Sequence, residues 1–98
     1  MTDDPDKDID DLDLRRKRAS YRAHHRGTKE MDWLISRYAD HHLGQMSEPE
    51  LLLFEEFLVL PDPELQNWIM GTQNVNDRRF AGLVDKLRCF HGLQSRAG

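Results

Sequence analysis

The chain has 98 residues, 38% of them hydrophobic and 33% charged, with one cysteine and a mean hydropathy of −0.78. This length allows one domain. The longest apolar runs, such as Leu51–Phe54, are too short to cross a membrane, and a single cysteine excludes a disulfide framework. The net charge of −4 argues against general nucleic-acid binding, but residues 1–13 carry a net charge of −6 and residues 14–30 carry +6.

Along the chain, residues 1–13 are rich in aspartate and poor in apolar residues, which predicts a disordered acidic tail. Residues 14–93 are predicted to form a helical domain, and residues 94–98 a frayed C-terminus. The first helix is expected over Leu14–His25, with Asp13 as its N-cap and Gly27 as the residue that ends it. The second is expected from about Thr28 to His42, before Gly44. Its apolar positions share one face and are Met31, Leu34, Ile35 and Tyr38.

The second half of the chain carries clear helix start and stop signals. Ser47 and Glu50 have the spacing of a capping box, which predicts a helix over Glu48–Val59 that ends before Pro61. The next helix is expected to begin with Asp62 as N-cap and Pro63 in its first position, and to end at Gly71. The last helix is expected between Asn76, as its N-cap, and Gly92. Together these segments predict an all-α fold, a compact five-helix bundle with a disordered acidic N-terminal tail.

The sequence contains few of the residue patterns that active sites use. The five histidines lack the spacing of a zinc site, and no phosphate loop, nucleotide fingerprint or nucleophile elbow occurs. We therefore predict that the chain is not an enzyme and has no metal site.

The most prominent feature that we predict to be exposed is a run of basic residues. Arg15, Arg18 and Arg22 lie on one face of the first helix, with Tyr21 beside them, and Arg26 extends the run. Three interpretations fit this pattern: a solvated charged face, a phosphate-binding stripe on nucleic acid, or a surface that recognises an acidic or mixed protein partner through its arginines.

Glu30 closes the basic run. It could pair with Arg26, four residues earlier, or be presented to a partner, and Gly27 between them would let a partner backbone approach closely.

Two motifs resemble those of a known family. The segment Arg26-Gly27-Thr28-Lys29-Glu30 matches the RGxxE motif of the small FAD assembly factors of succinate dehydrogenase, and Met31-Asp32 follows it as in that family. The segment Asp62-Pro63-Glu64-Leu65, followed by Asn67-Trp68, resembles the family's second signature. The resemblance covers roughly Leu14 to Phe90, and it also implies a five-helix bundle.

The resemblance implies a function as an assembly factor rather than an enzyme. Such a protein binds the flavoprotein subunit of succinate dehydrogenase, or in some bacteria of fumarate reductase, and promotes covalent attachment of FAD to a histidine of that subunit. It would hold no cofactor stably and would act on the FAD of its partner. The acidic start favours a bacterial, cytoplasmic member, expected to be a monomer when free, with no nucleic acid or membrane as partner.

Carried over by position, the resemblance also implies site residues. The partner-binding residues implied are Arg18, Tyr21, Arg22, His25, Arg26, Gly27 and Glu30. Asp62, Pro63 and Trp68 form the implied structural motif, and His25 stands where many relatives carry an arginine. The alternatives are a nucleic-acid-binding or antitoxin-like regulatory module that uses the same basic helix, and a helical adaptor with an unrelated protein partner.

Overall fold

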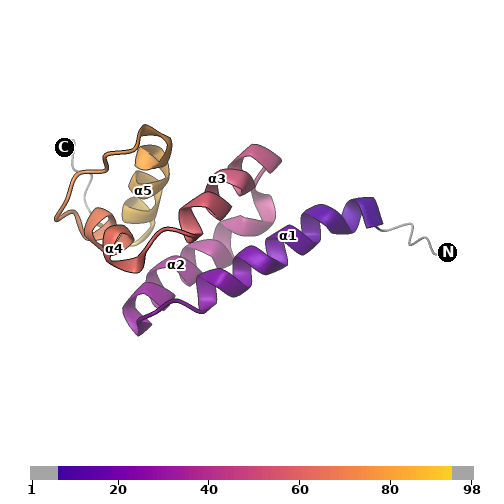
Figure 1. The fold of residues 1–98 in the computed structure, drawn as a ribbon, viewed down its shortest axis with the longest axis horizontal. Helices are drawn as coiled ribbons and strands as arrows, with labels where there is room; N and C mark the ends of the chain where they lie inside the picture. The colour runs from indigo at the N-terminus through magenta and orange to yellow at the C-terminus, as the bar shows by residue number, and fades with distance from the viewer. Residues whose placement is uncertain (1–6, 94–98) are drawn as a thin grey trace.

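The computed structural model describes the backbone of residues 7–93 and the side chains of residues 11–93. Its helices follow one another along the chain (Figure 1): α1 (Lys7–His24), α2 (Lys29–His42), a short 3₁₀ helix η1 (Leu43–Gln45), α3 (Glu48–Leu58), α4 (Asp62–Met70) and α5 (Arg78–Phe90). No strand occurs within residues 7–93. The prediction of an all-α fold with five helices is therefore confirmed.

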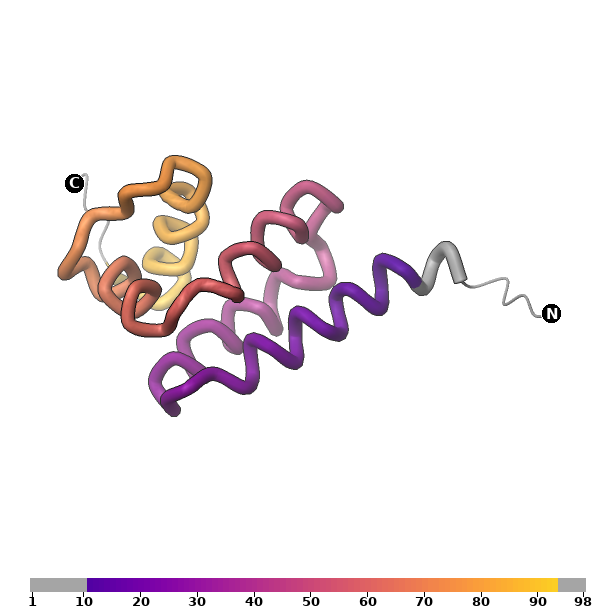
Figure 2. Tube along the Cα trace, viewed as in Figure 1, coloured from indigo at the N-terminus to yellow at the C-terminus, as the bar shows by residue number. Residues whose placement is uncertain are grey.

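The helices surround one apolar core. α1 and α2 form an antiparallel pair beside α3, and α4 and α5 lie at one end of this group (Figures 1 and 2). Buried aromatic rings join α3, α4 and α5: the ring centroids of Phe57 and Phe80 are 5.8 Å apart, and those of Trp68 and Phe80 are 6.1 Å apart. Such pairs contribute about 0.5–1.5 kcal/mol each beyond the area they bury. The apolar face predicted for α2 is also buried in this core.

The start of α1 differs from the expected boundary. The helix begins at Lys7, so residues 7–13 of the predicted tail are helical and Asp13 is not an N-cap. The aspartates occupy the N-terminal turns, where the helix dipole favours negative charge, and the side chain of Asp13 lies 3.3 Å from that of Arg16 one turn later. The prediction of a tail rested on the aspartate content and the few apolar residues of this block, and it did not include the helix dipole or the pair between Asp13 and Arg16. Residues 1–6 and 94–98 of the predicted termini lie outside the described residues.

The helix ends follow the sequence signals in most places. Ser47 and Glu50 form the predicted capping box, and Gly71 ends α4 in the left-handed conformation with a φ of 81°. Asp77, rather than Asn76, is the N-cap of α5, since its carboxylate accepts the N–H of Arg79. Gly44 does not stop the second helix abruptly, because it lies within η1.

Candidate functional site

The turn between α1 and α2 has a fixed backbone. The hydroxyl of Thr28 accepts the N–H of Met31 at 3.1 Å and caps α2, while the carboxylate of Asp32 accepts the N–H of Arg26. Figure 2 shows this turn beside the segment that joins α3 to α4. The first RGxxE residue, Arg26, therefore meets chain more than 30 residues later in the sequence.

Arg26 is the main link between these two segments. Its side chain is only 9% exposed, and its Nε and Nη2 donate to one oxygen of Asp62 at 2.8 and 2.5 Å. Nη1 donates to the carbonyl of Leu58 at 2.6 Å, and Nη2 to that of Leu60 at 3.2 Å. The Leu58 carbonyl is at the C-terminal end of α3, where the helix dipole favours a cation, and the Leu60 carbonyl follows in the segment that leads to α4. A buried guanidinium is tolerated when a carboxylate and several acceptors surround it in this way.

Gly27 completes this arrangement. Its N–H donates to the second oxygen of Asp62 at 2.7 Å, and a Cβ added to Gly27 would lie 2.9 Å from that oxygen. We call Arg26, Gly27 and Asp62 the clamp. We predicted that Gly27 ends the first helix, but α1 ends at His24, and Gly27 lacks the positive φ of a glycine that terminates a helix, which among the described residues belongs to Gly71 and Gly92. The close approach of Asp62 is what requires a glycine here.

The clamp also changes two other expectations. The Asp62 side chain does not cap α4; Pro61 is the N-cap residue, because the Asp62 carboxylate is already used by Arg26 and Gly27. Glu30 does not pair with Arg26 but accepts a hydrogen bond from Gln66 of α4 at 3.1 Å. The resemblance implied that Arg26 belongs to a partner-binding surface, whereas in this structure its guanidinium points inward and holds the turn.

The two sequence motifs therefore form one structural unit. Asp62 and Gln66 of the second motif contact the first motif directly, and Trp68, 1% exposed, anchors α4 in the core beneath them. Pro63 occupies the first turn of α4, where its missing N–H costs nothing. Sequence reasoning identified both motifs but missed their contact, because no local spacing pairs residues 36 positions apart.

The remaining predicted site residues are exposed. Arg18, Tyr21, Arg22 and His25 follow the spacing of one helix face on and just after α1. The rings of Tyr21 and His25 stack with centroids 3.9 Å apart, and His25 Nδ1 lies 2.8 Å from the Tyr21 carbonyl oxygen. We call these four residues, together with Gly27 and Glu30, the candidate surface.

Another arginine of the basic run contacts the rest of the fold. Arg15, predicted on the same exposed face as Arg18 and Arg22, instead donates from Nε and Nη2 to both oxygens of Glu55 at 3.1 and 2.8 Å. It also contacts Glu48, and thereby joins α1 to α3. Some arginines of the run therefore pair with acids of this chain, and others are exposed. This division is less suited to a continuous phosphate-binding stripe than the sequence suggested.

The pair between Arg15 and Glu55 makes stability depend on pH. The hydrogen bond from Arg15 holds the pKa of Glu55 below its usual value of 4.5. A lowered folded-state pKa stabilises the fold above the unfolded-state pKa, and this stabilisation is lost as the pH falls through the folded-state value. We expect the Tm, followed by circular dichroism, to fall as the pH drops below about 4.5. The Glu55→Gln variant should show a shallower fall, and the exposed Asp85→Asn control should match wild type. Equal slopes for Glu55→Gln and wild type would contradict this role.

Among the side chains described, no three His, Cys, Asp or Glu residues are grouped closely enough to hold a metal ion. None of the helices within the described residues combines the length and apolar character needed to span a membrane.

Comparison with known proteins identifies the family. A family model described as the flavinator of succinate dehydrogenase matches residues 17–91, more than half of the chain. The chain belongs to this family. The residues that match the succinate dehydrogenase flavinators include the whole clamp and the whole candidate surface, so the resemblance seen in the two motifs is confirmed.

Curated relatives carry related names. The chain is similar to the FAD assembly factor SdhE of Acetobacter pasteurianus, with 44% identity over 62 residues covering 63% of this chain and 57% of that protein. It is 40% identical to the FAD assembly factor SdhE of Xylella fastidiosa over 63 residues, which are 64% of this chain and 65% of the relative. The mitochondrial succinate dehydrogenase assembly factor 2 of Dictyostelium discoideum is 29% identical over 68 residues, covering 69% and 48%. The chain thus spans less than two thirds of the length of these flavinator relatives.

Proposed function

We propose that this chain binds the flavoprotein subunit of succinate dehydrogenase and promotes covalent attachment of FAD to that subunit. Membership of the flavinator family and the names of the relatives, which describe FAD assembly factors, support this function. In this proposal the FAD belongs to the partner, and the chain acts as an assembly factor rather than as an enzyme.

The observation that carries the proposal is the geometry of the RGxxE turn. The clamp holds the turn from inside, while Gly27 and Glu30 remain exposed on its outer side. A turn already fixed in the free protein loses little conformational entropy on binding, which favours its use as a docking element. The candidate surface carries the Glu30 carboxylate as well as the Arg18 and Arg22 cations, so charges of both signs can select both a partner and an orientation.

The same surface suggests how the factor acts. Its arginines, glutamate and stacked Tyr21–His25 pair can hydrogen-bond and orient a partner, and none of them is set up as a nucleophile. We propose that docking holds the flavoprotein and its FAD in a geometry in which groups of the flavoprotein itself form the covalent bond. Such positioning can remove a large part of a reaction barrier by restricting motion.

Replacing Glu30 by alanine tests this proposal. Among the described residues, Glu30 forms a hydrogen bond only with the half-buried Gln66, so the fold should survive, whereas the partner would lose a charged contact. We expect binding of the isolated flavoprotein, measured by calorimetry, to weaken about tenfold or more if Glu30 is a hot-spot residue. Covalent flavin on that subunit, measured by in-gel fluorescence in cells lacking the wild-type gene, should fall in parallel.

Two controls sharpen this experiment. Asp85→Ala removes an exposed acid on α5 and should leave both readouts at the wild-type level. Gln66→Ala removes only the partner of Glu30 within this chain and should have a smaller effect than Glu30→Ala. Wild-type flavin attachment in folded Glu30→Ala, or covalent flavin that persists when the gene is deleted, would refute the proposed function.

A further inference from the structure

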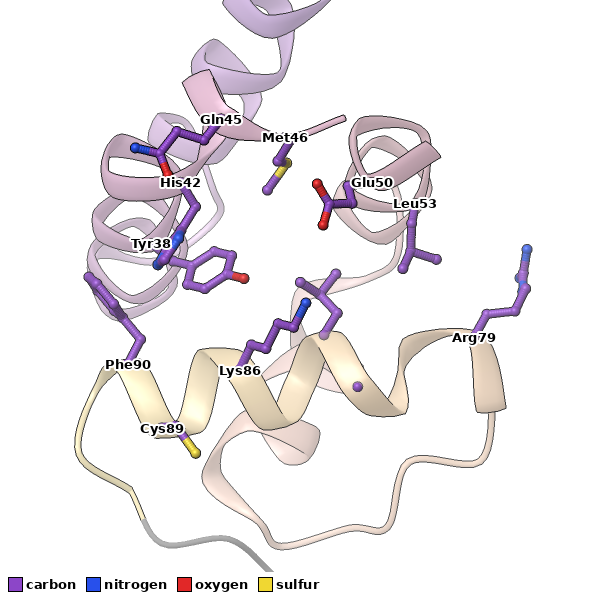
Figure 3. A pocket seen from close by; sticks show the side chains of 12 residues that line it. Tyr38, His42, Gln45, Met46, Glu50, Leu53, Arg79, Lys86, Cys89 and Phe90 are labelled. Carbon is purple, nitrogen blue, oxygen red and sulfur yellow. The ribbon is translucent and has the colours of Figure 1, made fainter. Parts of the chain in front are cut away.

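A second feature lies at the other end of α2. A groove of about 700 Å³ opens between α2, α3 and α5 (Figure 3), at the end of α2 opposite the RGxxE turn. Its apolar lining consists of Met46, Leu53, Leu83 and Phe90. Grooves of roughly this volume, with apolar walls and a few polar groups, are typical of small-ligand sites.

The hydroxyl of a largely buried tyrosine points into this groove. Tyr38 is only 4% exposed, and its ring is held edge-on by Phe90, with centroids 5.6 Å apart. Figure 3 shows its hydroxyl directed into the open space, and within residues 11–93 this hydroxyl has no hydrogen-bond partner. The hydroxyl oxygen itself is open to the groove and is not one of the buried polar atoms that lack a partner, so it can exchange hydrogen bonds with a ligand that enters there.

The ammonium group of Lys86 lies next to the same groove. Lys86 of α5 extends its ammonium group into the groove and makes no ion pair within the described residues (Figure 3). Arg79, at the far end, is already paired with Glu56 and Asp77. Glu50 faces Lys86 from α3, but one of its oxygens accepts the N–H of Ser47 at 2.7 Å as part of the capping box. Lys86 is therefore the cation best placed to meet an acid that enters the groove.

We propose that this groove binds a small organic acid with an apolar ring or short chain. The carboxylate would accept hydrogen bonds from the Tyr38 hydroxyl and the Lys86 ammonium, and the apolar part would lie against Leu53, Leu83 and Phe90. Both ends of such a ligand then match the groove, since apolar surface is buried and the carboxylate keeps charged hydrogen bonds. This site is separate from the candidate surface and does not depend on the proposed function.

An NMR titration of the full ¹⁵N-labelled chain tests the site. The probe is 3-phenylpropionate, and its neutral amide, 3-phenylpropanamide, is the matched ligand control. We expect saturable shifts of the Tyr38, Leu83 and Lys86 amides, with a Kd in the millimolar range that a ligand of this size allows. The amide should bind about tenfold more weakly, because it lacks the charged acceptor.

Variants separate the contributions of the groove residues. Tyr38→Phe keeps the ring and removes only the hydroxyl, so it and Lys86→Gln should each weaken binding about tenfold, whereas the exposed Lys29→Gln should not. Glu50→Gln keeps a residue that can form the capping box but removes the carboxylate that competes with the ligand for Lys86. Binding of the ligand should therefore tighten about twofold to fivefold.

Several results would overturn the assignment. These are the absence of saturable shifts at millimolar probe, equal binding of acid and amide, or unchanged binding by folded Tyr38→Phe. Tighter binding of the capped dipeptide N-acetyl-Phe-Asp-amide than of the free acid would also overturn it, since the groove would then serve a protein segment.

Discussion

Replacing Arg26 by alanine is expected to lower the free energy of unfolding by about 3 kcal/mol, since removing one partner of a buried ion pair leaves the other charge uncompensated. In this protein the loss would expose the Asp62 carboxylate and the carbonyls of Leu58 and Leu60 to an unfilled space. For a domain of this size, that corresponds to a Tm lower by roughly 12 °C or more. Chemical and thermal unfolding followed by circular dichroism measure both quantities.

The controls for this variant come from the same basic run. Arg22→Ala removes an exposed arginine and should change the free energy of unfolding by no more than about 0.5 kcal/mol. Arg26→Lys keeps the charge but loses the planar fork that reaches Asp62 and two carbonyls together, so its stability should be intermediate. If Arg26→Ala were as stable as Arg22→Ala, the clamp would not stabilise the fold.

Arg26→Ala should also show whether Arg26 holds the turn from inside or contacts the partner directly. If its function is to hold the turn, covalent flavin on the partner should be lost in proportion to the loss of folded protein and of turn structure. A double-mutant cycle with Asp62→Ala measures the coupling, which should reach about 1–3 kcal/mol for residues in direct contact. Additive effects of the two substitutions would show that Arg26 and Asp62 act independently.

Gly27→Ala is expected to destabilise the protein by about 1–3 kcal/mol, because the new Cβ would displace the Asp62 carboxylate that holds the turn. The new Cβ would lie 2.9 Å from an oxygen of Asp62, and that oxygen cannot move freely because it also accepts the Gly27 N–H. Displacing Asp62 would in turn weaken its hydrogen bonds to Arg26. We expect a lower Tm together with less covalent flavin on the partner.

The chain provides a matched control for this glycine. A Cβ on Gly82, within α5, would meet no atom within 4 Å. Gly82→Ala should therefore stabilise the helix by about 0.5–1 kcal/mol, opposite in sign to Gly27→Ala. The cost of Gly27→Ala should also shrink in an Asp62→Ala background, where the clash is removed. A cost that stays the same there would mean that the contact with Asp62 is not what requires Gly27.

Local signals predicted much of the fold. The α2 face that carries Met31 and Tyr38 and the capping box of Ser47 and Glu50 were confirmed, because both depend on residues three to seven positions apart. The predicted start of α1 was wrong, since residues 7–13 are helical and Asp13 pairs with Arg16 one turn later instead of capping the helix. The Asp62 cap was wrong for a different reason: a long-range partner competes for its carboxylate.

By itself, the sequence determined that five helices form, which face of α2 is buried, and the two motifs that resemble the family. Only the tertiary structure decided which charges of the basic run are exposed: Arg15 and Arg26 turn inward to Glu55 and Asp62, while Arg18 and Arg22 remain on the surface. The physical reason is the range of the interactions. Helix periodicity and capping are local, whereas an ion pair between residues 36 or 40 positions apart forms only after the helices have packed.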